Sequence, residues 1–508
     1  MNAFLNGLTN ATNYRYTENG ALTHKSTRSA LLDMFAMGAA MRKRSDEDVI
    51  VMFRNAFAEN PVYALKCLFY IRDVRGGQGE RRFFRTCMKD LAVQNTEAAR
   101  RNLKYVPEFG RWDDLYVFMG TPLENDALNF MKEQLALDVQ CKTPSLLAKW
   151  LKSENTSSKE SRKLAQKTRS YFGMTHREYR KTLSILRERI NVLERLMSAG
   201  KWDEIEFDKI PSKAGMIYKN AFARHDLERQ KSEKEVQTYA EFAKDTTKKV
   251  NAEVLNPVDI ADRIFAHRWN SPTETDRAMY QKYWNNLKDY YNGREENGIA
   301  VVDVSGSMTG QPMNAAVSMG AYIAERGKGP FANHFITFSG NPQLVKFEGV
   351  DIYDKFIRAQ SADWAMNTDI EATFDLLLNT ALANNCSQEE IPATIYIFSD
   401  MEFDRCATMG SASTDRYNYY GSKNPITAAN RDTLFEAIKK KWAAHGYKLP
   451  RVIFWNLDAR QENIPAIGEG FSFVSGFSMN MVEQILSGED GYSLMMKKLN
   501  TERYACIG

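Results

Sequence analysis

Five oxygen-bearing side chains in the second half of the chain stand where they could bind one cation. Asp303, Ser305 and Ser307 are spaced two residues apart and directly follow an apolar run. Thr368 precedes a segment with helical spacing, and Asp400 ends a second apolar run. Such runs are typical of buried parallel strands, whose carboxyl ends carry the ligand sites of open α/β sheets. We therefore expect the five side chains to meet at one edge of a sheet.

The donor set favours a hard cation. Two carboxylates and three hydroxyls, without a nitrogen or sulfur ligand, suit Mg²⁺ or another divalent ion of that kind. Mg²⁺ usually retains water molecules in proteins, so one exchangeable position would remain for a carboxylate or phosphate of a partner. The set resembles the metal-ion-dependent adhesion site of a von Willebrand factor A domain. The structural alternative is a strand that simply ends in a polar turn.

The elements that must position these residues alternate between strands and helices. Strand-like and helix-like runs follow one another from residue 298 onward, which predicts a parallel, Rossmann-like sheet covered on both faces. The expected strands are 298–304, 334–339, 343–347, 393–399, 451–456 and 471–474, and the expected helices are 312–325, 368–383, 431–445 and 480–487.

The length and composition indicate a folded protein of several domains. A chain of 508 residues exceeds the size of one ordinary core. Six cysteines, at positions 67, 87, 141, 386, 406 and 506, form no Cys-x-x-Cys pair, which favours reduced thiols over zinc ligands or disulfides. No apolar run approaches the ~20 residues that span a bilayer. We therefore expect a cytoplasmic protein without a membrane partner.

Charge is distributed unevenly along the chain. Residues 296–508 contain 18 Lys and Arg against 25 Asp and Glu, a net charge of −7. Residues 1–295 contain 50 against 39, a net charge of +11, and most of this excess lies between residues 142 and 250. A basic part joined to an acidic part indicates a polyanion partner for the first half only. The alternative is an ordinary solvated helical surface that is rich in Lys and Arg.

The first half has a helical pattern almost throughout. Residues 1–25 are polar and predict a flexible N-terminal arm. Residues 26–294 combine helical periodicity with a turn every few tens of residues, which fits stacked antiparallel helices of the HEAT-like kind. The composition changes near residue 294, so that residues 295–508 form the sheet domain.

The densest polar motif of the first half is the segment 72–82, which follows an apolar helix. Its glycines allow close backbone approach, and Arg72, Arg75 and Arg81 offer guanidinium groups that suit phosphate or carboxylate. Opposite charges alternate in this segment, so its side chains could equally pair with one another and fix a turn between helices. Both interpretations remain open at this point.

The ordered set of motifs resembles a known architecture. The segments 72–82, 110–115, 148–159, 210–214 and 218–226, followed by the A-type domain, resemble the TROVE module of the Ro autoantigen and its plant, fungal and phage relatives. The resemblance implies that the helical repeats close into a ring that binds single-stranded RNA ends, while small structured RNAs bind its outer surface. By this resemblance the candidate RNA contacts are Lys149, Lys213, Lys219, Arg224 and His225, with Arg72, Arg75 and Arg81 behind them.

Two functions are therefore in competition. The first is an RNA-binding scaffold with a basic helical ring and a Mg²⁺-binding A-type domain. The second is a protein-interaction module that docks an acidic partner side chain on the cation, without nucleic acid. An enzyme is disfavoured, since the chain has neither a His-Glu-x-x-His motif nor a Gly-x-Ser-x-Gly elbow.

Overall fold

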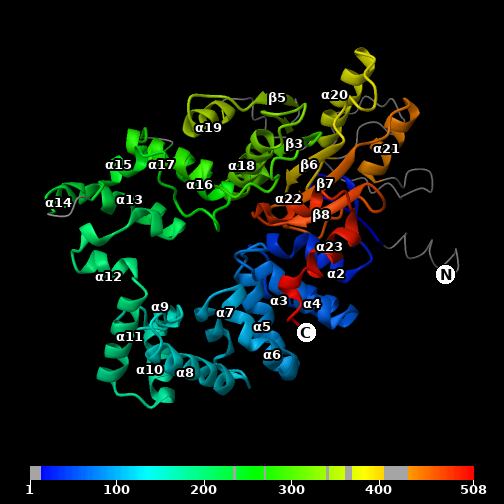
Figure 1. The fold of residues 1–508 in the computed structure, drawn as a ribbon. Coiled ribbons are helices and arrows are strands. Elements are labelled where there is room, and N and C mark those ends of the chain that lie inside the picture. Colours follow the sequence, from blue (N-terminus) through cyan, green and yellow to red (C-terminus); the bar gives the residue numbers. More distant parts are fainter. Residues whose placement is uncertain (1–12, 233–235, 268–269, 339–341, 361–368, 405–432) are drawn as a thin grey trace. The chain divides into compact units, whose positions relative to one another are not determined.

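The computed structural model describes residues 13–232, 236–267, 270–338, 342–360, 369–404 and 433–508 (Figure 1). A helical region is followed by an α/β domain with a six-stranded, mostly parallel sheet, which confirms the predicted fold class. No helix among the described residues is both long and apolar enough to cross a bilayer.

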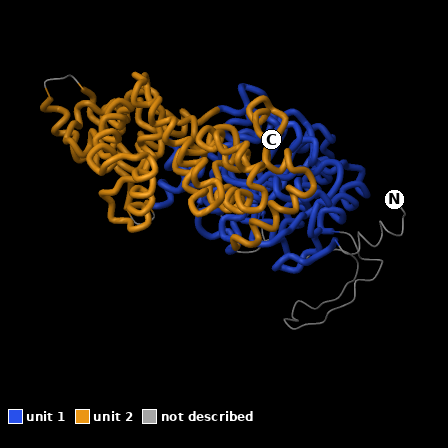
Figure 2. Tube along the Cα trace, turned by 90° about the horizontal axis from the view of Figure 1, so that it is seen from below, with its two compact units in different colours: residues 1–44, 257–266, 289–498 blue, residues 45–256, 267–288, 499–508 orange. Residues whose placement is uncertain are grey.

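The chain forms two compact units, coloured separately in Figure 2. The sheet unit comprises residues 1–44, 257–266 and 289–498, and the helical unit comprises residues 45–256, 267–288 and 499–508. The sequence suggested simple boundaries near residues 25 and 294, whereas the chain passes between the two units several times.

The sheet has the strand order β5-β4-β3-β6-β7-β8. Five strands are parallel, and the edge strand β5 pairs with β4 in the antiparallel direction. The chain leaves β3 for β4 on one side and later returns to β6 on the other, which creates a topological switch point between β3 and β6. The strands are β3 (Gly298–Asp303), β4 (His334–Phe338), β5 (Gln343–Lys346), β6 (Thr394–Ser399), β7 (Arg451–Asn456) and β8 (Phe471–Ser475).

Helices pack on this sheet because the strands are apolar over most of their length. Helix α18 lies against β3, β4 and β6, and Gly320 allows the close approach, since a Cβ there would lie 2.4 Å from Cγ2 of Val302. The helices of the sheet unit are α2 (Ala30–Met37), α16 (Pro257–Phe265), α18 (Gln311–Arg326), α19 (Ile352–Gln360), α20 (Ile370–Ala383), α21 (Leu434–Ala444), α22 (Val482–Ile485) and α23 (Gly491–Leu499), of which the last residue belongs to the helical unit.

An N-terminal hairpin belongs to the sheet unit. Strands β1 (Tyr14–Tyr16) and β2 (Leu22–His24) pair in the antiparallel direction. The Thr17 hydroxyl donates to the carbonyl of Phe403 at 2.7 Å, and backbone bridges join the hairpin to the segments that follow β6 and β7. Residues 13–25 of the segment expected to be a flexible arm are thus bound to the sheet unit.

The helical unit contains the following helices, most of which Figure 1 labels: α3 (Asp46–Glu59), α4 (Pro61–Arg72), α5 (Arg82–Gln94), α6 (Thr96–Asn102), α7 (Val106–Phe109), α8 (Glu124–Gln140), α9 (Leu147–Trp150), α10 (Lys159–Phe172), α11 (His176–Arg189), α12 (Leu193–Ser198), α13 (Ser212–Arg224), α14 (Asp226–Gln230), α15 (Tyr239–Lys244) and α17 (Glu274–Asn285). The C-terminal residues return to α4, where Arg503 pairs with Asp73 and the Tyr504 hydroxyl donates to the same carboxylate at 3.0 Å.

Candidate functional site

Four of the five predicted cation ligands lie together where β3 and β6 end. Asp303 is the last residue of β3, and it accepts the Ser305 backbone N–H at 2.9 Å and the Ser399 hydroxyl at 2.5 Å. The hydroxyls of Ser305 and Ser307 are 3.0 Å apart, and the Ser307 hydroxyl in turn bonds to Asp400. We use the name rim for this cluster, which consists of Asp303, Ser305, Ser307, Ser399 and Asp400. Thr368, the remaining predicted ligand, lies outside the described residues.

The rim holds two carboxylates that have lost most of their water. Burial, followed by the negative charge of Asp400, raises the pKa of Asp303 to about 7. Burial also raises the pKa of Asp400 above its usual range. Its Oδ2 atom is buried and accepts no hydrogen bond from the described residues. Desolvated carboxylates beside hydroxyls, with one oxygen still open, form an environment that a cation would stabilise.

The donor set therefore fits the hard cation that the sequence suggested. Asp303, Ser305, Ser307 and Asp400 would hold it, and the ion would supply a positive charge with an exchangeable water position. The described residues contain no group of three or more His, Cys, Asp or Glu side chains placed to hold a metal. A cation at the rim would thus depend on hydroxyls and water as well as on the two carboxylates.

Two charged residues that were not identified from the sequence, Arg460 and Glu402, lie beside the rim. Arg460 places one guanidinium nitrogen 3.7 Å from Asp400 Oδ2 and another 2.6 Å from Glu18 of the N-terminal hairpin. Glu402 accepts hydrogen bonds from the Glu18 backbone at 2.8 Å and from Asn463 at 2.7 Å, and burial raises its pKa to about 7. Arg460 lies 60 residues beyond Asp400 in the chain, so no local pattern connects the two.

The candidate RNA contacts of the helical unit fall into separate groups. One group lies on α13 and at its C-terminal end. Lys213 and Arg224 are exposed, whereas Lys219 is half-buried and donates to Asp276 at 2.6 Å and to Tyr280 at 2.9 Å. His225 stacks on Trp202 with ring centres 3.8 Å apart. Lys213 and Arg224 are thus accessible to solvent, and the ammonium group of Lys219 is paired with Asp276.

A second group surrounds the turn between α4 and α5. Arg72 is only 1% exposed and donates two hydrogen bonds, at 2.9 and 2.7 Å, to Asp114, which is itself buried. Gly110 makes room for this pair, because a Cβ there would lie 2.4 Å from Asp114 Oδ2. Arg72 therefore has a structural role, and its guanidinium cannot reach RNA. Arg75 and Arg81 are exposed.

Lys149 belongs to the third group, on the short helix α9. It is half-buried beside Trp150, over whose ring the guanidinium of Arg111 also lies, 4.1 Å from the ring centre. The backbone N–H of Arg111 donates to Asp114 at 2.9 Å. The motifs 72–82, 110–115 and 148–159 thus form one network of contacts. Its charged and aromatic residues hold the helices together.

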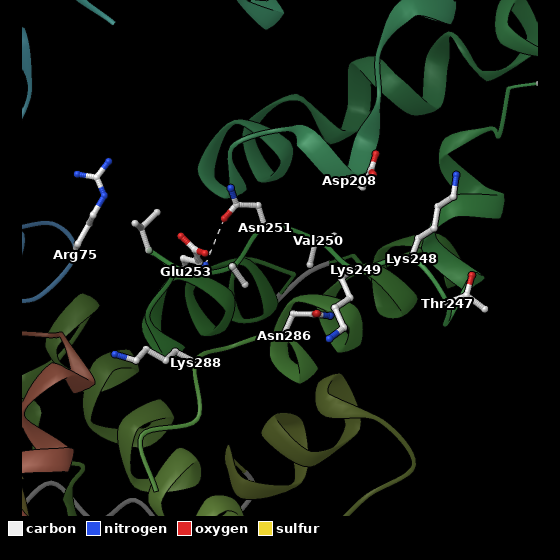
Figure 3. A pocket seen from close by; sticks show the side chains of 12 residues that line it. Arg75, Asp208, Thr247, Lys248, Lys249, Val250, Asn251, Glu253, Asn286 and Lys288 are labelled. Carbon is white, nitrogen blue, oxygen red and sulfur yellow. Dashed lines mark hydrogen bonds between the residues drawn. The ribbon is translucent and has the colours of Figure 1, made fainter. Parts of the chain in front are cut away.

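A hollow of about 960 Å³ opens in the helical unit. Figure 3 shows its cations on several elements: Arg75 comes from the turn after α4, Lys248 and Lys249 from the segment between α15 and α16, and Lys288 from the segment after α17. All four side chains are exposed. The remaining lining residues are Asp208, Thr247, Val250, Asn251, Ala252, Glu253, Val254 and Asn286. Four cations face two carboxylates, so the hollow carries a net positive charge.

The segment 245–256 that supplies two of these lysines is held firmly in place. The buried amine of Lys282 on α17 donates to the carbonyl of Lys248 at 2.8 Å and also to that of Asp245. Exposed and buried residues then alternate from Lys249 to Glu253, as in an extended strand. In this part Val250 and Ala252 are buried, and Lys249, Asn251 and Glu253 are exposed.

This alternation is visible in the sequence and could have identified the segment. The meeting of Arg75 and Lys288 at one hollow could not be foreseen, because it depends on how distant helices pack. Of the hollow's four cations, sequence reasoning identified only Arg75.

Most of the chain is similar to protein families, to a viral protein and to a solved structure. The family model "Domain of unknown function (DUF2828)" matches residues 17–163 and 136–296, and "Domain of unknown function (DUF7788)" matches residues 297–503. An uncharacterised protein of Acanthamoeba polyphaga mimivirus is 31% identical over 517 residues, which cover 94% of this chain and 85% of that protein. The crystal structure of the Deinococcus radiodurans Ro (RSR) protein aligns over 95% of each chain, with 14% identity and a TM-score of 0.38.

Proposed function

The chain belongs to the family of the domain of unknown function DUF2828, here joined to the domain of unknown function DUF7788, and we propose that it is an RNA-binding scaffold. Its helical unit binds the phosphate backbone of single-stranded RNA in the hollow. The observation that carries this proposal is the set of four exposed cations from three separate segments around one concavity.

The lining of the hollow distinguishes a nucleic acid from a small metabolite. Small-molecule sites are mostly apolar and aromatic, with a few polar groups that fix orientation. Nine of the twelve lining residues here are polar or charged, and none is aromatic. Lysines and arginine neutralise phosphates, while the amides of Asn251 and Asn286 can contact sugars or base edges. Without aromatic faces, base stacking contributes little in the hollow, so we expect weak sequence preference and strong dependence on salt.

A second set of exposed cations lies on α10 and α11, which follow one another in the chain. Lys163, Arg177, Arg180 and Lys181 are exposed and form no ion pair with any described carboxylate. Glu178, which is also on α11, is engaged instead in capping the helix through Thr175. Exposed cations on two helices can contact phosphates of a folded RNA, which makes α10 and α11 a second contact area for structured RNA.

The test is the salt dependence of RNA affinity. Fluorescence anisotropy with a labelled single-stranded RNA compares the full chain with the variant R75Q/K248Q/K249Q/K288Q between about 50 and 200 mM salt. Each lost phosphate contact lowers the slope of log affinity against log salt by about 0.7, so the variant is expected to lose up to about 3. The matched control, K346Q/R358Q/K439Q/K497Q, removes four exposed cations from the sheet unit and is expected to keep the slope.

Two results would contradict the proposal. One is that the wild-type protein binds no RNA. The other is that the hollow variant and the sheet-unit control lose equal affinity, because net charge rather than the hollow would then govern binding.

A second candidate function is supported by the rim. The open oxygen of Asp400 beside buried Asp303 favours a bound divalent cation, and such a cation could capture a carboxylate of a protein partner. In that case Asp303→Ala abolishes the chelator-sensitive recovery of protein partners and leaves copurifying RNA unchanged. An unchanged set of partners would exclude this second function.

We propose a binding role for the rim and not a catalytic one. Two-metal phosphodiester hydrolysis places two cations about 4 Å apart, which requires carboxylates to bridge and flank them. The described rim offers two carboxylates and three hydroxyls, a donor set better suited to one ion and one captured ligand.

A further inference from the structure

Arg460 is the positively charged side chain beside the open oxygen of the rim. Its side chain is about one third exposed, and two of its guanidinium nitrogens face two different carboxylates. The contact with Glu18 is close, at 2.6 Å, whereas the approach to Asp400 stops at 3.7 Å, which is too long for a hydrogen bond. Arg460 therefore lies near the position that a cation would occupy, but it is held by a residue from another segment.

That other segment is the N-terminal hairpin, whose position is fixed independently of Arg460. The Glu18 backbone donates to Glu402 at 2.8 Å, and the side chain of Asn19 donates to the carbonyl of Glu402 at 2.6 Å. The Thr17 hydroxyl adds its bond to Phe403. These hydrogen bonds attach the hairpin to the residues directly after Asp400. They therefore hold the carboxylate of Glu18 beside Arg460.

We propose that Arg460 is the resident counter-charge of the rim and that Glu18, by holding Arg460 back from Asp400, sets the affinity of the rim for a divalent cation. The inference rests on the proposed cation site. It assigns to the N-terminal hairpin a role in cation binding, although the hairpin supplies no ligand.

The direction of each effect follows from charge. A guanidinium a few ångströms from a ligand oxygen repels a divalent ion and competes with it for Asp400. Removing the positive charge of Arg460 therefore strengthens cation binding. Removing the negative charge of Glu18 has the opposite effect, because Arg460 loses its alternative partner and is free to pair with Asp400. With Arg460 already absent, the loss of Glu18 has little further effect.

The affinity of the full chain for a divalent cation tests these three effects directly. Mn²⁺ is the probe, and its free concentration is read by electron paramagnetic resonance in titrations of the wild type, R460Q, E18Q and R460Q/E18Q. We expect R460Q to bind Mn²⁺ on the order of tenfold more tightly than the wild type, since one nearby charge shifts an ionisation equilibrium by about that factor. E18Q is expected to bind severalfold more weakly, and the double variant to match R460Q.

The controls separate this inference from the site on which it rests. R358Q removes an exposed, ion-paired arginine of the same unit and is expected to bind as the wild type does. D303N is expected to abolish binding in every background. If neither the wild type nor R460Q binds Mn²⁺, the cation site and the inference both fail. If both bind with equal affinity and D303N does not, the site stands and the role of Arg460 is refuted. The unfolding temperature gives a second readout without added metal. If E18Q changes it and R460Q/E18Q restores it, Glu18 and Arg460 are coupled in the metal-free chain as well.

Discussion

At the scale of single residues, the arginines of one motif in the helical unit differ in whether they are buried in an ion pair or exposed to solvent. Arg72 and Arg75 illustrate the contrast, since they are three positions apart in one motif. Arg72 is buried against Asp114, to which Arg85 also donates at 2.6 Å, whereas Arg75 is exposed at the hollow. Burial alone would raise the pKa of Asp114, but the ion pairs with Arg72 and Arg85 outweigh it and lower that pKa.

The buried pair predicts a large loss of stability in the variant Arg72→Met. Removing one partner leaves Asp114 buried with incomplete compensation, which costs about 3 kcal/mol in comparable pairs. Urea unfolding followed by circular dichroism measures this loss. Arg75→Gln is the control and is expected to change the free energy of unfolding by less than about 0.5 kcal/mol. Equal stability of the two variants would show that the Arg72–Asp114 pair is not a structural contact of this weight.

The rim predicts that pH and Mg²⁺ act together on stability. The pKa of Asp303 is raised to about 7 in the folded, cation-free chain and lies near 3.8 when unfolded, so the folded state favours the protonated form. The resulting stabilisation is complete below about pH 4 and is lost as the pH rises towards about 7, by on the order of 4 kcal/mol. Because a cation requires the ionised carboxylates, Mg²⁺ is expected to raise the melting temperature more at about pH 8 than at about pH 5.

Differential scanning fluorimetry of the wild type and of Asp303→Asn measures both effects. The variant, which has no charge to titrate at this position, is expected to show a weaker pH dependence and no stabilisation by Mg²⁺. A wild type that gains equally from Mg²⁺ at both pH values would contradict the assignment.

At the scale of elements, the sequence pattern predicted the strands that are determined by their own residues. The apolar runs that become β3, β6, β7 and β8 are identifiable without the structure, and Asp303 and Asp400 are located simply by being at strand ends. The hairpin of β1 and β2 was missed, because its strands have three residues each and are stabilised by residues almost 400 positions away. The reversed direction of β5 was missed as well, because it depends on pairing with β4.

The exposed cations of helices α10 and α11 give a prediction of their own. The variant K163Q/R177Q/R180Q/K181Q is expected to keep its helix content, since Gln is a good helix former, and to lose affinity for a hairpin RNA by on the order of tenfold. Its affinity for a short single-stranded RNA is expected to change less. Electrophoretic mobility shifts with the two RNAs decide this, and equal losses for both would contradict the assignment of the two surfaces to different RNA forms.

At the scale of the whole molecule, segments distant in the sequence complete each compact unit. The last ten residues of the chain belong to the helical unit, where Arg503 and Tyr504 contact Asp73, and residues 13–44 belong to the sheet unit. This exchange explains why single domain boundaries drawn from composition describe the chain incompletely. It also explains why the cations of the hollow could not be grouped from the sequence, as Arg75 and Lys288 are more than 200 positions apart.

The most direct test of the central claim is to locate bound RNA on the protein. A uridine-rich single-stranded RNA is cross-linked to the full chain with ultraviolet light, and the linked peptides are identified by mass spectrometry. We predict cross-links within residues 245–256 and near Asn286 and Lys288, and their loss in R75Q/K248Q/K249Q/K288Q. Cross-links confined to the sheet unit, or unchanged in that variant, would contradict the claim that the hollow of the helical unit binds RNA.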